Sequence, residues 1–493
     1  MATAAPGTTV TVTTAPSTAG VPAPNTGTGF VAGLTAHGPV GVPILCTSMQ
    51  DFITLCGPRV GYSTLYDVAS LFFSRGTVLY VSRTVGPAST TATIALKDSS
   101  AATCLNAAAL GAGVDGISIS VAVVAGPTAG TYQLVVSYPN ATTIVETSPS
   151  LVTAADAVAW GTPPNPQVVS NTHSNWLAIT AGTSTNAPAV VAAAALTGGA
   201  DDNSNVTDAI TVAALAFFVE ALGPGQVAAP GRATATTYAG LGAHAASKNR
   251  LAVCDLPDGI STSTAITDSA LVQSSIVAGS TDPSFACSVG PWVLWPGIPT
   301  GTAVPSWARS VPASAAFMAL CAQNDAQNDC NVAAAGDNGI LAGALGLSES
   351  FDTVRGSLNN AGTCVFRVIN NAVTLYGWVS EAVDPNWQDL SSSRFRMQLV
   401  ADANIIGNNY VFSQIDPQGK VIGAFNGDLT NLCQKYYAAG SIYAFEINTG
   451  TTVNTPATIA ARQLNAAITL QFSPSAPWVN INLTKYLVSS PLP

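Results

Sequence analysis

The residues of this chain that could do acid–base chemistry are few. The histidines are His37, His173 and His244, so a Ser-His-Asp site would have to use one of them. No G-x-S-x-G sequence supplies an activated serine. Asp255 follows the apolar run RLAVC, where α/β enzymes often place a catalytic acid, although DLPDG is also an ordinary turn sequence. A hydrolase that uses Asp255 and His244 is therefore the catalytic hypothesis that the sequence leaves open.

Three short stretches resemble ligand-binding motifs, and each departs from its pattern. GAGVDG (111–116) fits G-x-G-x-x-G, but a helix-like CLNAAAL precedes it and the strand-like ISISVAV follows, which is the wrong context for a dinucleotide. DPQGKV lacks the first glycine of a phosphate loop. DDNSNVTD has Val206 where a calcium loop needs glycine. The sequence therefore predicts no cofactor and no metal, and it favours a structural protein over an enzyme.

The cysteines predict a reducing compartment. Nine are present, without a C-x-x-C pair, and several lie in apolar runs, where free cysteine behaves as a small buried hydrophobe. The N-terminus has no basic segment followed by an apolar run, so no secretory signal is predicted. The most apolar run, ITVAALAFFVEALG, is too short to span a bilayer.

The composition predicts an assembly subunit. Charged residues make up 9% of the chain, against about 25% in ordinary soluble domains. Because mixed surface charge usually keeps proteins apart, we expect much of this surface to be covered by partners. The net charge of −10 argues against nucleic-acid binding. Residues 1–354 carry 8 basic and 19 acidic groups, and residues 355–493 carry 8 and 7, so the C-terminal quarter is electrostatically distinct.

Hydrophobic periodicity predicts α/β and α+β domains in one chain. GFVAGLT, PILCTS and TVLYVSRTV read as strands around the amphipathic helix YSTLYDVASLFFSRG, and the pattern resumes near residue 207 with TDAITVAALAFFVEAL, QVAAPG, TATTYAGLGAHAASKN and RLAVCDLPDG. RLAVCD has the composition of a buried parallel strand. We therefore predict a discontinuous α/β domain over residues 29–95 and 206–354, with an extended loop at 280–310.

Two further domains are predicted on either side of this pattern. Residues 96–205 contain the β runs GISISVAVV, TYQLVVSY and ATTIVET with one helix near SLVTAADAVAW, which predicts a mostly β insertion. Residues 355–475 predict a compact α+β domain with a CVFRVIN–AVTLYGW hairpin and two helices, SSRFRMQLVADANII and NGDLTNLCQKYYAAG. QLNAAITLQF then alternates as a strand with Ile468 and Leu470 on one face.

The two ends of the chain, residues 1–28 and 476–493, are strand-prone arms. TTVTVTT and WVNINLT alternate but have no local partner strand. An unpaired strand is an aggregation hazard, whereas a strand donated to a neighbour's sheet gives affinity through main-chain hydrogen bonds. Head-to-tail donation does not close and propagates as a helix. Together with the QLNAAITLQF strand, the predicted inter-subunit strands contain Thr9, Val10, Thr11, Val12, Ile468, Leu470, Val479, Ile481 and Leu483.

A series of motifs occurs in a characteristic order. The arm carries APGTTVTV, and GFVAGLTAHGPVGVPILCTSMQDFITLCG and DVASLFFSRGTVLYVSRTVG follow. Later come GPWVLWPGIP, VPASAAFMALCAQND and LNNAGTCVFRVINNAVTLYGWVSEAVDPNWQDLSSSRFR. In this order the chain resembles the contractile tail sheath proteins of bacteriophages and related contractile injection systems.

The resemblance implies a mechanical function. Sheath proteins stack as helical rings around a rigid tube, and contraction drives the tube through the host envelope. It implies an inner C-terminal domain, an outer inserted domain, and terminal arms that complete a sheet in a neighbouring subunit. The implied partners are further copies, the tail tube protein, and baseplate and tail terminator proteins, without nucleic acid or membrane insertion. The implied location is the virion, after assembly in the host cytoplasm. Another virion or surface-lattice protein is the alternative.

The positive charge of the C-terminal domain suggests where a tube would bind. Arg394, Arg396, Lys420 and Lys435 lie in its predicted helical segments, and we expect some of them to face an acidic tube surface. The simpler interpretation is an ordinary solvated helix face.

Overall fold

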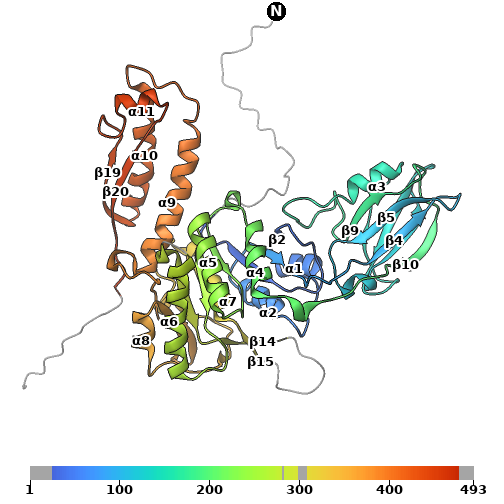
Figure 1. Ribbon diagram of the computed structural model, residues 1–493, viewed down its shortest axis with the longest axis horizontal. Helices are drawn as coiled ribbons and strands as arrows, with labels where there is room; N and C mark the ends of the chain where they lie inside the picture. Colours follow the sequence, from blue (N-terminus) through green and yellow to red (C-terminus); the bar gives the residue numbers. More distant parts are fainter. Residues whose placement is uncertain (1–24, 280–281, 298–307, 477–493) are drawn as a thin grey trace, which may run out of the picture.

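The computed structural model describes residues 25–279, 282–297 and 308–476, and an eight-stranded sheet lies at its centre (Figure 1). The strand order is β18-β17-β13-β12-β11-β1-β3-β2, and only the edge strands β2 and β18 run antiparallel to their neighbours. In that order the strands are Ala372–Leu375, Thr363–Ile369, Ala286–Gly290, Leu251–Asp255, Gln226–Ala228, Gly29–Gly33, Leu79–Arg83 and Ile44–Cys46.

Helices cover both faces of this sheet. Successive residues of a strand point to opposite faces, and because the residues on both faces are apolar here, each face needs a covering layer. Val31 and Val253 pack toward α1, α2 and α7. Phe30 and Ala252 pack toward α4, α5, α6 and α8. The α/β prediction for this part of the chain is confirmed. The helices are α1 Met49–Cys56, α2 Leu65–Phe72, α4 Asp208–Ala214, α5 Ala235–Lys248, α6 Thr262–Gly279, α7 Ala313–Gln327 and α8 Arg355–Asn360.

Two expectations from the sequence, one for a loop and one for a domain boundary, differ from the structure. The segment 280–310 was expected to be a loop, but it contains β13, β14 (Val293–Pro296) and the start of β15 (Ala308–Val311). Strands β14 and β15 form a small sheet with β16 (Gly346–Leu347). The β17–β18 hairpin was assigned to a C-terminal domain beginning at residue 355, yet β17 pairs in parallel with β13 of the central sheet. This pairing joins segments far apart in sequence, so local periodicity could not reveal it.

The strands between Thr93 and Ala195 form two further sheets, drawn to the right in Figure 1. CLNAAAL, expected to be helical, lies largely in β5, where Leu105 and Ala107 pair with β4 and β9. Burial between two strands overrides the helix propensity of alanine here. The elements are β4 Thr93–Lys97, β5 Thr103–Ala109, β6 Ser120–Ala125, β7 Tyr132–Ser137, β8 Ile144–Thr147, α3 Ala154–Trp160, β9 Leu177–Ala181 and β10 Val191–Ala195.

The C-terminal unit is elongated and stands away from the central sheet (Figure 1). Its helices α9 and α10 and its two-stranded sheet enclose a small core around Phe395, Cys433 and Tyr436. The elements are α9 Leu390–Asn408, α10 Lys420–Ala438, β19 Ile442–Asn448, α11 Pro456–Ala460 and β20 Ala467–Phe472.

A carboxyl group that lacks hydrogen bonds lies in the central core. Glu381 has no exposed surface, and neither of its carboxylate oxygens has a hydrogen-bond partner among the described residues. The hydroxyl of the neighbouring Ser288 pairs with Thr363 at 2.7 Å. Burial raises the pKa of Glu381 to about 8, and the nearby Ser288 offsets only part of this shift.

The stability of the chain should therefore fall between about pH 6.5 and about pH 8. In this range the unfolded chain has an ionised Glu381 while the folded chain keeps the proton, so stability is lost as the pH rises toward the folded-state pKa. We expect a loss of roughly 2 kcal/mol in the free energy of unfolding, measured with urea at both pH values. Glu381→Gln should remove most of this loss, whereas Glu446→Gln, at an exposed position, should keep it. Equal stability of the unaltered chain at both pH values would contradict the prediction.

Candidate assembly surface

Strands β19 and β20 form the sheet that could accept a strand from another copy. They pair antiparallel from Ile442–Phe472 to Asn448–Ala467. Ile468 and Leu470 are half-buried against the core of the C-terminal unit, as the alternation predicted. The intervening positions of the strand, Ala467, Thr469 and Gln471, are exposed. A two-stranded hairpin is at best marginally stable by itself, so its stability here depends on packing against α9 and α10.

Within the described residues this sheet has only these two strands, so each has one edge without a partner strand. Such edges are templates for strand addition. The predicted donor residues lie outside the part of the chain that the structure describes: Thr9, Val10, Thr11, Val12, Val479, Ile481 and Leu483. Their exchange between copies stays a prediction.

Arg394 does not face a tube, and the prediction for this residue is wrong. Its side chain is fully buried, and Nη2 donates to Asp325 Oδ2 at 2.6 Å. Thr26 donates its hydroxyl to the same oxygen, also at 2.6 Å. Burial alone would lower the pKa of Arg394, but the Asp325 carboxylate more than offsets this and raises it. The arginine thus ties α9 to α7 and to the segment that leads into β1.

Arg396 is also held by internal contacts. Its guanidinium lies 3.8 Å from the ring centre of Phe285 and 4.3 Å from that of Trp387. It pairs with Asp282 at 3.0 Å, and 18% of its side chain is exposed. Because so little of the guanidinium is free, we no longer expect Arg396 to contact a tube.

Lys420 and Lys435 are the candidates of this set that reach solvent. Both are exposed on α10, one at its first residue and one in its last turn. Lys435 also lies 5.0 Å from the ring centre of Tyr436. The structure leaves these two cations available to a partner.

The turn between α9 and α10 carries exposed apolar residues that the sequence interpretation missed. Val411 is 57% exposed and Phe412 is fully exposed with a φ of +67°. Ile405, on the last turns of α9, is 64% exposed. The run NYVF between two helices was the available signal, since apolar residues in a loop need a partner to be covered.

The proposed hydrolase pair does not form. Tyr238 of α5 donates to the carbonyl of Asp255, while His244, six residues further along α5, contacts Arg250 at the other end of β12. Six helical residues span about 9 Å. Asp255 accepts from the backbone and hydroxyl of Ser314, both at 2.7 Å.

The protonation states also do not suit a hydrolase. Burial, with a smaller contribution from Arg250, lowers the pKa of His244 to about 3, so this imidazole is too weak a base at neutral pH. Burial raises the pKa of Asp255 to about 6. Both residues serve the packing around β12.

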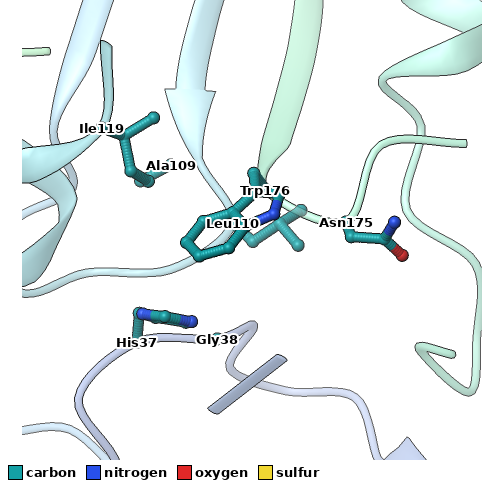
Figure 2. Close-up of a pocket in the computed structure, with 7 residues that line it drawn as sticks. All are labelled: His37, Gly38, Ala109, Leu110, Ile119, Asn175 and Trp176. Carbon is teal, nitrogen blue, oxygen red and sulfur yellow. The ribbon is translucent and has the colours of Figure 1, made fainter. Parts of the chain in front are cut away.

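His37 lies at the junction between the central sheet and the inserted strands. Figure 2 shows its ring facing that of Trp176, and the ring centres are 4.9 Å apart. Its Nδ1 is 2.6 Å from Asp115, which also accepts from Tyr138 at 3.0 Å. Asp115 belongs to the GAGVDG stretch, so this glycine-rich segment positions an interdomain contact.

None of the described helices has both the length and the apolar character needed to cross a membrane. Among the same residues, no group of three or more histidine, cysteine or acidic side chains is placed to hold a metal ion.

Comparison with known proteins gives matches in structure only. No protein-family model and no curated protein sequence matches the chain. The sheath tail protein Lin1278 from Listeria innocua is similar over 88% of this chain and 90% of its own, with a TM-score of 0.57 and 14% identity. The sheath complex of an extracellular contractile injection system (PVC), in the contracted state, is similar over 98% of both chains, with a TM-score of 0.55 and 12% identity. The helical sheath of the anti-feeding prophage, also contracted, has a TM-score of 0.52 and 14% identity over 98% of this chain and 99% of its own.

These similarities show the fold of contractile sheath proteins. They extend over nearly the whole chain, including the central sheet, the inserted strands and the C-terminal unit. The resemblance inferred from the order of motifs is confirmed at the level of fold.

Proposed function

We propose that this chain is the subunit of a contractile sheath, which polymerises helically around a tail tube and shortens to drive the tube through a cell envelope. The observation that carries the proposal is the likeness to contracted sheath structures over 98% of the chain. The low charge content and the unpaired edges of β19 and β20 within the described residues are in keeping with a subunit that is covered by its neighbours.

Contraction by rigid bodies fits this architecture. The central sheet is closed on both faces by helices, so it should move as one body, and packed interfaces are bistable rather than continuously deformable. The terminal arms would keep neighbours connected while these bodies rotate. The energy would be stored at assembly, which requires no cofactor.

The proposed partners follow from the same reasoning. Other copies form the helical stack, a tube protein lies inside, and baseplate and tail terminator proteins bound the ends. The proposed location is a phage-like particle that is assembled in the host cytoplasm.

Negative-stain electron microscopy of the purified chain tests the proposal directly. Hollow cylinders are expected. Flat sheets would instead indicate a surface lattice, and dispersed particles under all assembly conditions would reject both.

Binding of the tube should depend on salt if Lys420 and Lys435 face it. The attraction between exposed charges extends over a screening length of about 8 Å at physiological ionic strength, and this length shortens as salt is added. Association should therefore weaken as the salt concentration is raised. Lys420→Gln/Lys435→Gln should weaken co-sedimentation with the tube at low salt and flatten the salt dependence. Arg355→Gln, which removes an exposed charge on α8, is the matched control. An unchanged salt dependence in the double variant would contradict the assignment.

A further inference from the structure

A cavity of about 540 Å³ lies beside the carboxyl ends of β1 and β11. Its lining comes from segments that are distant in sequence: residues 32–34 at the end of β1, 61–65 leading into α2, 230–232 after β11 and 308–310 in β15. Within the part of the chain that the structure describes, Arg59, Asp67 and Trp292 complete the lining. The volume is within the range of about 300–1,000 Å³ that is usual for ligand pockets.

The topology of the sheet explains why a cavity forms at this place. From β1 the chain continues to β2 and then β3, which both lie on one side of it, and from β11 it continues to β12 on the other side. The two connections therefore diverge above neighbouring parallel strands. Ligands of open α/β sheets bind at such switch points, outside the carboxyl ends of the strands.

The cavity is positively charged. Among the described residues, three arginines line it: Arg59, Arg232 and Arg309. Arg59 donates from Nε to both oxygens of Asp67, at 2.9 and 3.0 Å. Arg232 pairs with Asp208 at 3.0 Å.

Arg309 has no comparable partner. Among the described residues it forms no ion pair, and its Nε is buried without a hydrogen bond. The hydroxyl of Ser310 is likewise buried and unpaired within that part of the chain. Unpaired buried donors cost free energy, so this wall of the cavity is incomplete without an acceptor.

We propose that the cavity receives a carboxylate-bearing loop of a second copy of this chain. This inference rests on the proposed polymeric function. The planar guanidinium group favours a carboxylate, which it binds through two hydrogen bonds. Every copy carries a net charge of −10, so copies repel one another unless acidic groups meet cations. Arg83, Arg250 and Arg394, by contrast, are buried inside the subunit and cannot serve this purpose.

The test is the self-association of Arg309→Gln. We expect the concentration needed for assembly, measured by sedimentation, to rise about tenfold or more, because a charge-assisted pair is lost at every subunit contact. Arg309→Lys keeps the charge but loses the planar fork, and it should fall between Arg309→Gln and the unaltered chain. Arg355→Gln should assemble like the unaltered chain. Thermal unfolding of the dispersed variants checks that each one is folded.

Two results would overturn the inference. One is assembly of folded Arg309→Gln at the same concentration as Arg355→Gln. The other is calorimetric binding of citrate or inorganic phosphate that is lost in Arg309→Gln while assembly is unchanged, which would make the cavity a small-anion site. Failure of the sheath proposal is distinguishable, because it shows in the shape of the particles under the microscope. An unaltered chain that does not self-associate at all would reject both.

Discussion

Arg394→Met should lower the free energy of unfolding by about 3–5 kcal/mol. The substitution leaves the Asp325 carboxylate largely buried, with 10% of its side chain exposed and, among the described residues, only the hydroxyl of Thr26 as a side-chain donor. Removing one partner of a buried ion pair strands the other charge in a medium that solvates it poorly. Urea unfolding of the dispersed chain measures the effect.

The companion variants separate the ion pair from simple packing. Arg394 Nε and Asp325 Oδ1 have no hydrogen-bond partners in the described part of the chain, so the pair is imperfectly compensated. Arg394→Met/Asp325→Leu should therefore recover most of the lost stability, since replacing a whole buried pair by apolar residues is often neutral or better. Arg355→Met, on the exposed face of α8, should change stability by no more than about 0.5 kcal/mol. An Arg394→Met chain as stable as this control would refute the interpretation.

Removing residues 1–20 should abolish tube formation and leave the subunit folded. The deletion takes away the TTVTVTT segment, which is predicted to be a strand, and leaves the residues just before β1, which begins at Gly29. The main-chain hydrogen bonds of a donated strand would supply a link between neighbours that is lost with the deletion. Sedimentation and electron microscopy measure assembly, and circular dichroism with thermal unfolding checks the fold.

A point substitution gives the same test without shortening the chain. Val10→Pro removes a ladder donor and disfavours a strand, so it should impair assembly strongly. Thr18→Pro, outside the TTVTVTT run, is the matched control and should assemble normally. Normal tubes from the truncated chain would show that the arm is not the link.

The helices and strands of this chain were largely predictable because they depend on neighbouring residues. The alternation around Ile468 and Leu470 and the helix around Val68 follow from spacings of two and of three to four residues. CLNAAAL was one exception, because β4 and β9 on either side of β5 decide its conformation. The segment 280–310 was another, because it was expected to be a loop but contains β13, β14 and the start of β15.

The candidate tube-facing site was predicted less well, and Arg394 shows why. From the sequence it is a cation on a helix and indistinguishable from a solvated one. Its burial depends on Asp325 and Thr26, which lie 69 and 368 residues away along the chain. Lys420 and Lys435, whose exposure needs no distant partner, were placed as expected on the surface.

Composition and local periodicity were enough to predict the α/β class, most of the helices and strands, the scarcity of charge and the strand-prone character of the two ends. Three features became visible only in the folded chain: β17 and β18 complete the central sheet, Arg394 is internal, and Arg59, Arg232 and Arg309 meet around one cavity. The physical reason is that burial and electrostatic environment are set by contacts between distant segments, which no local pattern records.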